Sequence, residues 1–257
     1  MNTSFADIEK KENRKDLIIS ICVFLSGFSC FAQLYYFQPL LPDLAKDFIL
    51  SASESSFAIS FSTLGMVFGL FTTMFVADRI PRKKMIGTGL LSSSIFSVAA
   101  SFSPTFLPLI LLSAAKGFLL SGATSVSMAY IAEEVSSRNK GKIMGLYIAG
   151  NALGGMAGRV ISSWIGALYT WRIASVSIGL ICALFAILFL LFSPRSTNFM
   201  PRKESFHTLI IANLQLITSK ALIPFYLTGG LILGVFVSLY NFLGFYLAKA
   251  PFNSPEQ

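Results

Sequence analysis

Seven long apolar runs divide the chain, and their length limits what it can fold into. A helix needs about 20 apolar residues to cross about 30 Å of bilayer hydrocarbon, and each run is close to that length or longer. None of the runs alternates polar with apolar residues, as membrane-spanning strands do. The expected spans are residues 17–39, 55–77, 85–102, 105–132, 143–168, 173–192 and 221–248. The sequence therefore predicts an all-α integral membrane protein.

The composition agrees with this class and excludes others. Hydrophobic residues make up 54% of the chain, charged residues only 12%, and the mean hydropathy is +0.70. The net charge of +8 does not indicate a nucleic-acid partner, because the basic residues lie in short segments between apolar runs. A single histidine excludes a multi-histidine metal site, and the sequence holds no phosphate-binding loop or catalytic constellation. It indicates neither an enzyme nor a cofactor nor a metal.

The Lys and Arg residues predict how the spans are oriented. Fifteen of the 20 lie in the N-terminal tail (residues 1–16), in the loops after spans two and four, and in the connector after span six (194–220). Positively charged loops favour the cytoplasmic side of a membrane. We therefore expect a cytoplasmic N-terminus, a six-helix half at residues 17–193, span seven at 221–248, and an external tail at 249–257.

The second part of the connector, SFHTLIIANLQLITS, is amphipathic. A segment of this kind lies along a membrane surface more readily than across it. It contains the only histidine, His207, for which a solvated side chain at the interface is the simple interpretation. A proton relay is the alternative, because histidine changes its charge near neutral pH.

Two basic residues lie within the expected spans, where a charge costs about 2.5–3.5 kcal/mol at mid-membrane. They are Lys116 in span four and Arg159 in span five. Such charges face a cavity or a partner, and no Asp or Glu lies in any of the seven spans. Snorkelling of the side chains to the interface is the alternative. Further polar residues that could line the same substrate cavity are Gln33, Tyr36, Gln38, Thr124, Asn151, Tyr240 and Asn241.

Span five also carries a glycine stripe. Gly150, Gly154 and Gly158 recur every four residues along one helical face, and Gly155 lies beside them. Small residues at this spacing let two helices approach closely in lipid. The stripe therefore predicts a helix-packing surface, with a bent or moving helix as the alternative.

The charged loop DRIPRK, from Asp78 to Lys83, is similar to the D-R-x-G-R-K loop between spans two and three of a family of transporters, the major facilitator superfamily. GNALGG, from Gly150 to Gly155, resembles the G-P-x-x-G-G motif of its proton-coupled exporters. LYYFQPLLPDLAKDF, MAYIAEEV and GLYIAGNALGGMAGR look like bacterial inner-membrane exporters of the arabinose-efflux type, and the resemblance covers residues 17–252.

The resemblance implies a major facilitator fold of twelve spans in two halves, which rock about a site near the midplane. It implies a proton-coupled exporter of a small organic solute, drug-like, sugar or organic anion, in the bacterial inner membrane. It also implies that the loop after span two is a gate that holds the outward-open state. The candidate gating residues are Asp78, Arg79, Arg82 and Lys83 in this loop, with Glu133, Glu134 and Arg138 near the next basic loop.

The chain departs from the family pattern at five motif positions. Pro81 and Met74 stand where the loop motif has glycines, so the turn and its packing differ. Asn151 replaces the proline of the span-five motif and removes its kink. In span four, Ser113 stands for the arginine of R-x-x-Q-G and Lys116 for its glutamine, which moves the charge by about one helical turn.

The number of spans is the largest departure. The 257 residues hold seven of the twelve expected spans, the N-terminal six-helix half plus span seven. We therefore expect a fragment, a split half or a truncated product. One alternative function is a non-transporting remnant, or a subunit that needs a separate C-terminal half. A more distant one, a seven-helix receptor, is disfavoured by the predicted cytoplasmic N-terminus and by a span seven without an internal lysine.

Overall fold

The computed structural model of the chain describes residues 5–201 and 206–247, and these fold into ten α-helices and one 3-10 turn. The expected external tail at 249–257 lies outside the described residues, and so does the side chain of His207. The elements are α1 (Phe5–Tyr35), α2 (Leu41–Asp47), α3 (Ala52–Ser55), α4 (Phe57–Val76), η1 (Ala77–Arg79), α5 (Arg82–Ser101), α6 (Phe106–Glu134), α7 (Lys140–Leu168), α8 (Trp171–Phe192), α9 (Phe206–Ile217) and α10 (Ile223–Leu247).

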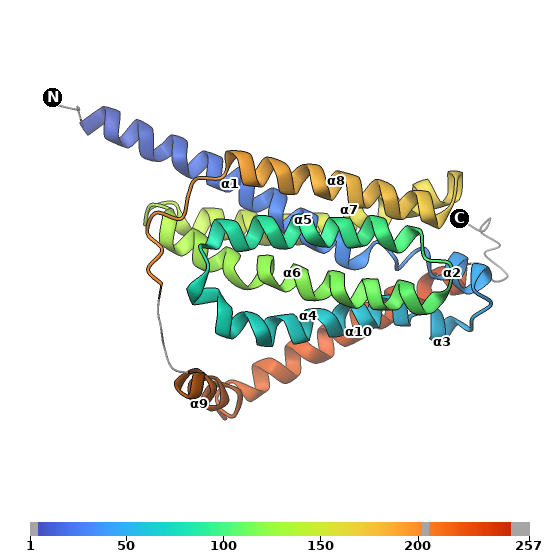
Figure 1. The fold of residues 1–257 in the computed structure, drawn as a ribbon. Helices are drawn as coiled ribbons and strands as arrows, with labels where there is room; N and C mark the ends of the chain where they lie inside the picture. Colours follow the sequence, from blue (N-terminus) through green and yellow to red (C-terminus); the bar gives the residue numbers. More distant parts are fainter. Residues whose placement is uncertain (1–4, 202–205, 248–257) are drawn as a thin grey trace.

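Six long helices, α1 and α4 to α8, form a lengthwise bundle, with α10 running along one side (Figure 1). The N-terminal end of α1, the α4–α5 and α6–α7 connections and the end of α8 lie at one end of the bundle. The α5–α6 and α7–α8 connections lie at the opposite end. We call the first of these the basic end, because most Lys and Arg residues lie there. The amphipathic helix α9 lies at the corner of the basic end next to the start of α10, roughly perpendicular to the bundle (Figure 1).

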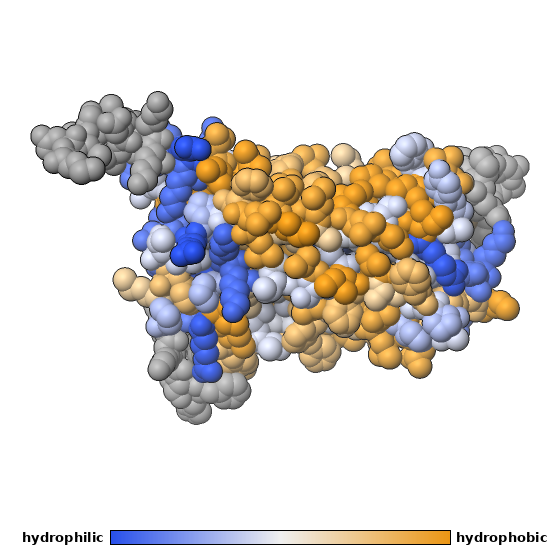
Figure 2. Space-filling view, turned by 45° about the horizontal axis from the view of Figure 1, so that its top comes forward, coloured by the Kyte–Doolittle hydropathy of each residue, from blue (hydrophilic) through white to orange (hydrophobic). Residues whose placement is uncertain are grey.

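Five of the described helical segments are long and apolar enough to cross a membrane: Glu12–Tyr35, Ala52–Arg79, Phe106–Glu134, Trp171–Phe192 and Ile223–Leu243. The helices α5 and α7 have spanning length, 20 and 29 residues, and lie in the same bundle. They are less apolar because α5 carries five serines and α7 seven glycines. Figure 2 shows a broad apolar band around the middle of the bundle, with hydrophilic residues gathered at both ends.

Several helix boundaries differ from the expected spans. The helix α1 begins at Phe5, inside the expected polar tail, because FADIEKKENRKD consists largely of good helix formers. It ends at Tyr35, before the expected 39, since Pro39 disfavours a helical conformation at the residue preceding it. Before α4 the chain forms the short helix α3, which Ser51 and Glu54 cap reciprocally.

The glycine stripe of α7 lies against α1. A Cβ at Gly154 would lie 2.1 Å from the carbonyl oxygen of Phe28, and Gly150 and Gly158 meet α1 backbone in the same way. A second close approach joins α4 to α6, where a Cβ at Gly117 would lie 1.8 Å from the carbonyl oxygen of Ser62. Backbone contact of this kind leaves no room for any side chain, so these glycines determine how closely the helices pack.

Candidate functional site

Arg159, on α7, lies at a junction of three helices. Its Nε donates to Oε1 of Gln38, just after α1, and its Nη1 donates to the carbonyl oxygen of Gly155 at 2.7 Å. The guanidinium lies 4.5 Å from the ring centre of Tyr35 and 4.6 Å from that of Tyr240, on α10. Aromatic faces attract guanidinium groups, and most strongly where water is excluded.

One nitrogen of this guanidinium, Nη2, is buried and has no hydrogen-bond partner within residues 5–201 and 206–247. Among the residues that the structure describes, no carboxylate forms an ion pair with Arg159. A buried, unpaired guanidinium nitrogen is costly, and a planar carboxylate is the ligand whose geometry fits it best. The arrangement can therefore bind an organic anion, with the flanking rings offering contacts to an aromatic or apolar part of the ligand.

The helix α10 contacts the bundle at this junction. Nε2 of Gln38 donates to Oδ1 of Asn241 at 3.0 Å, and the ring of Phe236 lies 5.4 Å from the guanidinium of Arg159. The rest of α10 is almost entirely exposed. We call Tyr35, Gln38, Arg159, Phe236, Tyr240 and Asn241 the Arg159 cluster.

Lys116, on α6, occupies a different place, inside the six-helix bundle. Its side chain is 1% exposed, and Nζ has no hydrogen-bond partner among the described residues. The rings of Tyr36 and Phe37 lie 4.5 Å and 4.9 Å from Nζ. Gln33 is equally buried and is hydrogen-bonded to Ser29 of α1 and Ser97 of α5.

The predicted cavity residues thus fall into two groups. Arg159, Tyr240 and Asn241 meet in the Arg159 cluster, whereas the side chains of Gln33, Tyr36 and Lys116 are enclosed by the bundle. Thr124 donates to backbone carbonyls of its own helix, and the side-chain oxygen of Asn151 is buried. The sequence analysis missed Tyr35 and Phe236. The second had a usable signal, since Phe236 and Tyr240 are four residues apart on one helical face.

Arg82, at the start of α5, is the centre of the charged loop. Its Nη2 donates to Oδ1 of Asp78 at 2.9 Å and to Oε1 of Glu133, at the end of α6, at 3.0 Å. Its Nη1 donates to the carbonyl oxygen of Ala77 at 2.6 Å. We call Asp78, Arg82 and Glu133 the Arg82 cluster. Arg79 and Arg138 are exposed at the same end of the bundle.

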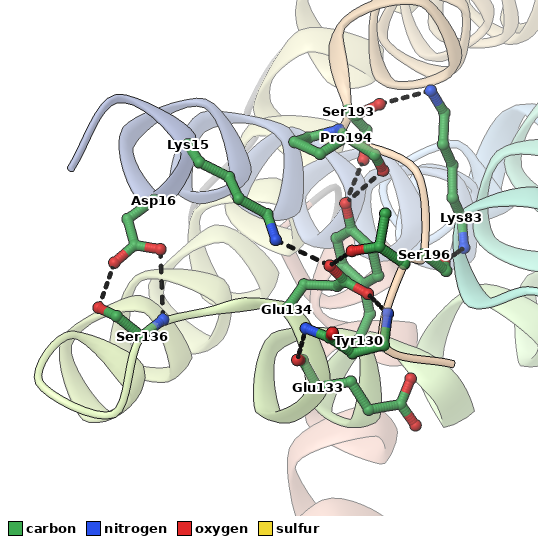
Figure 3. Close-up of polar contacts among 12 residues, drawn as sticks. Lys15, Asp16, Lys83, Tyr130, Glu133, Glu134, Ser136, Ser193, Pro194 and Ser196 are labelled. Carbon is green, nitrogen blue, oxygen red and sulfur yellow. Dashed lines mark hydrogen bonds and ion pairs between the residues drawn. The ribbon is translucent and has the colours of Figure 1, made fainter. Parts of the chain in front are cut away.

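A second carboxylate, Glu134, lies next to this cluster (Figure 3). It is buried and accepts a hydrogen bond from Nζ of Lys15, on α1, at 2.9 Å. Asp16, also buried, accepts from the backbone N–H and the hydroxyl of Ser136, in the α6–α7 loop. These contacts tie α1 to the end of α6 and to the α6–α7 loop. The sequence analysis did not assign a role to Lys15 or Asp16.

A cavity of about 210 Å³ lies elsewhere, between α4, α5 and α6, and none of the candidate residues lines it. Its walls are small and apolar side chains with a few hydroxyl groups. They include Gly69, Thr72, Thr73, Gly89, Phe118 and Gly122.

Comparison with known proteins identifies the family. The sequence profile described as Major Facilitator Superfamily matches residues 20–253. The chain belongs to the Major Facilitator Superfamily. Membership makes it a multi-pass membrane protein of a transporter family rather than an enzyme family, and the candidate spans agree with this.

Relatives within the superfamily are described as transporters. The inner membrane transport protein YnfM of Escherichia coli (strain K12) is 35% identical over 236 residues, which cover 91% of this chain and 56% of YnfM. An uncharacterized transporter of Buchnera aphidicola subsp. Schizaphis graminum is 35% identical over 245 residues, covering 95% of this chain and 59% of the relative. The chain therefore spans less than two thirds of the length of these curated relatives.

A solved structure shows the same fold. It is a bacterial homolog of the human lysosomal transporter Spinster, in an inward-facing and unoccupied conformation. The TM-score is 0.74 at 16% sequence identity, over 91% of this chain and 56% of that one. The chain therefore has the all-helical major facilitator fold over its N-terminal six-helix half and one further helix.

Proposed function

We propose that this superfamily member is a secondary active transporter that works by alternating access in the bacterial inner membrane. In this proposal α1, α4 to α8 and α10 cross the membrane, and the basic end faces the cytoplasm. The concentration of Lys and Arg at that end supports this orientation. A C-terminal half completes the transport path, and the share of the relatives that this chain covers supports its existence.

The transported solute is a small organic anion, which binds at the Arg159 cluster. The observation that carries this is the buried, unpartnered Nη2 of Arg159 between aromatic rings. The niacin transporter NiaP of Acinetobacter baylyi, 27% identical over 141 residues covering 55% of this chain and 32% of NiaP, gives modest support, because niacin is an aromatic carboxylate. Drug-like cations and uncharged sugars are the competing substrate classes.

The mechanism is proton-coupled export. The solute and the proton each bind the two states with different affinity, so that the proton gradient drives the solute outward. In the outward-open state the charged loop contacts the C-terminal half and holds the cytoplasmic end closed, and Arg82 fixes the shape of this loop by joining the α4–α5 turn to the end of α6.

The proposal is tested by flux in proteoliposomes that contain the chain together with a C-terminal half from YnfM. Nicotinate and benzoate are compared with the uncharged nicotinamide under an imposed pH gradient. We expect flux of the two anions only, and a loss of at least about tenfold in apparent affinity in Arg159→Gln, since a hydrogen bond to a charged group is worth about 1.5–3 kcal/mol. Arg159→Lys keeps the charge but not the planar guanidinium, and we expect its apparent affinity to lie between that of the unchanged protein and that of Arg159→Gln.

Two outcomes contradict this proposal. Flux that persists after the proton gradient is collapsed rules out the coupling, and equal flux of nicotinamide rules out the anion site. A second candidate function is a half-transporter subunit that is inactive alone, which the largely exposed α10 favours. Flux by this chain without any partner half would exclude that second function, and it would equally contradict the role of the C-terminal half in the first.

A further inference from the structure

The first residues after α8 are not a loose continuation of the helix. Ser193–Phe199, which we call the strap, lies beyond the end of α8. The backbone N–H of Ser193 still donates to the carbonyl oxygen of Phe189, and the segment then crosses the basic end of the bundle in contact with α5 and α6. At its start, the hydroxyl of Tyr130, on α6, donates to the carbonyl oxygen of Pro194 at 2.8 Å, and Ser193 bonds to the same hydroxyl (Figure 3). Lys83 adds a hydrogen bond from Nζ to the carbonyl oxygen of Ser193.

Glu134 binds the middle of the strap. Its carboxylate accepts a hydrogen bond from the hydroxyl of Thr197 at 2.8 Å and from the backbone N–H of Asn198 at 2.7 Å. Lys15 donates to the same carboxylate from α1. The side chain of Glu134 is fully buried, so it depends on these three donors to compensate for lost hydration. The hydrogen bonds to this buried carboxylate therefore hold the strap in one position.

The strap also completes the start of α5. The first N–H groups of a helix have no partner within the helix, and Pro81, which precedes α5, provides no side-chain cap. The hydroxyl of Ser196 accepts a hydrogen bond from the backbone N–H of Lys83 at 3.0 Å and thus takes the role of the missing cap. The strap therefore stabilises the helical turn that carries Arg82.

The end of the strap contacts the Arg82 cluster itself. The guanidinium of Arg82 lies 4.9 Å from the ring centre of Phe199. The side-chain amide of Asn198 donates to the backbone carbonyl oxygen of Glu133 at 2.8 Å. Two members of the Arg82 cluster are thus held partly by residues of the connector, and this contact does not use the side chain of Glu133.

We propose that the strap is a fixed part of the N-terminal bundle and that it braces the Arg82 cluster. Glu134 is the positioning residue: it holds Thr197 and Asn198, and through them the strap keeps Arg82 and the first turn of α5 in place. The connector between the two halves is then mechanically joined to the charged loop. Movement of the connector is therefore transmitted to Arg82 through the contacts of Phe199 and Ser196.

Amide hydrogen exchange of the purified chain in detergent, read by mass spectrometry, tests the proposal. In the unchanged protein we expect slow exchange in peptides that cover the Asn198 amide and the Lys83 amide. Glu134→Gln should speed exchange at both places by about tenfold or more, since a charge-assisted bond is replaced by a weaker neutral one. Glu133→Gln is the matched control: it changes the adjacent carboxylate, whose side chain binds Arg82 and not the strap.

In this control, the exchange rate of the peptide that covers Asn198 should stay within about twofold of its rate in the unchanged protein. The proposal is overturned if the Asn198 amide of the unchanged protein exchanges at the rate of an unstructured peptide. It is overturned as well if Glu134→Gln and Glu133→Gln change the exchange rates equally. It is also overturned if Glu134→Gln leaves the Lys83 amide unaffected. If Glu134→Gln does not fold, two other variants replace it. Ser196→Ala must then speed exchange of the Lys83 amide, and Thr197→Val must speed exchange of the Asn198 amide. The measurement needs no solute, so its failure is distinct from failure of the transport assay.

Discussion

Gly154→Ala should loosen the pairing of α1 with α7. The new Cβ would lie 2.1 Å from the carbonyl oxygen of Phe28, whereas ordinary contact begins at 3.4 Å, so the two backbones must separate by about 1.3 Å. Overpacking of this kind costs roughly 1–3 kcal/mol, and the better helix propensity of alanine offsets about 0.5–1 kcal/mol. The net loss is therefore up to about 2.5 kcal/mol, which lowers the Tm in detergent by up to about 10 °C.

Gly145→Ala, on the same helix, is the matched control. No atom lies within 4 Å of the position of its Cβ, so the substitution keeps the gain in propensity without the clash. We expect the Tm to rise by about 1–4 °C. A Gly154 variant that melts at or above the temperature of the Gly145 variant would contradict this prediction, since the close approach of the two helices would then contribute no energy.

Two further stability predictions follow from buried or paired charges. Lys116→Met removes an enclosed ammonium that has no hydrogen-bond partner among the described residues, and we expect thermal melting to show a gain of about 1 kcal/mol or more. Burial disfavours ionisation of Asp47, but hydrogen bonds from Trp171 and Arg172 outweigh it and lower its pKa. The stabilisation is therefore complete above about pH 3.9 and lost as the pH falls through the lowered pKa. The Tm difference between Asp47→Asn and the unchanged protein should be present at about pH 6 and shrink as the pH falls below about 3.9.

The sequence could predict the bundle because membrane spans are a property of single segments. Apolar length, the positions of basic residues and the proline at the end of the first span are all local signals. They do not show which helices become neighbours. The stripe of α7 predicts one closely packed face, but that its partner is α1 depends on how the whole bundle assembles.

The candidate site shows the same limit at single residues. Asp78 and Arg82 are close in sequence, and the structure pairs them. Glu133 and Glu134 are neighbours, yet successive residues of a helix point about 100° apart. One therefore faces Arg82, and the other faces Lys15 and the strap. Only the packed bundle distinguishes these two carboxylates.

The helix α1 links the two regions that the structure singles out. Near the start of α1, Lys15 binds Glu134, which holds the strap. Three residues after the end of α1, Gln38 binds Arg159 and Asn241. A helix of 31 residues spans about 46 Å and bends little, so a shift at one end reaches the other. The contact of Gly154 with α1 lies between them. If α1 carries this coupling, Gly154→Ala should speed exchange at the Asn198 amide as well as lower the Tm, whereas a purely local clash would lower the Tm alone.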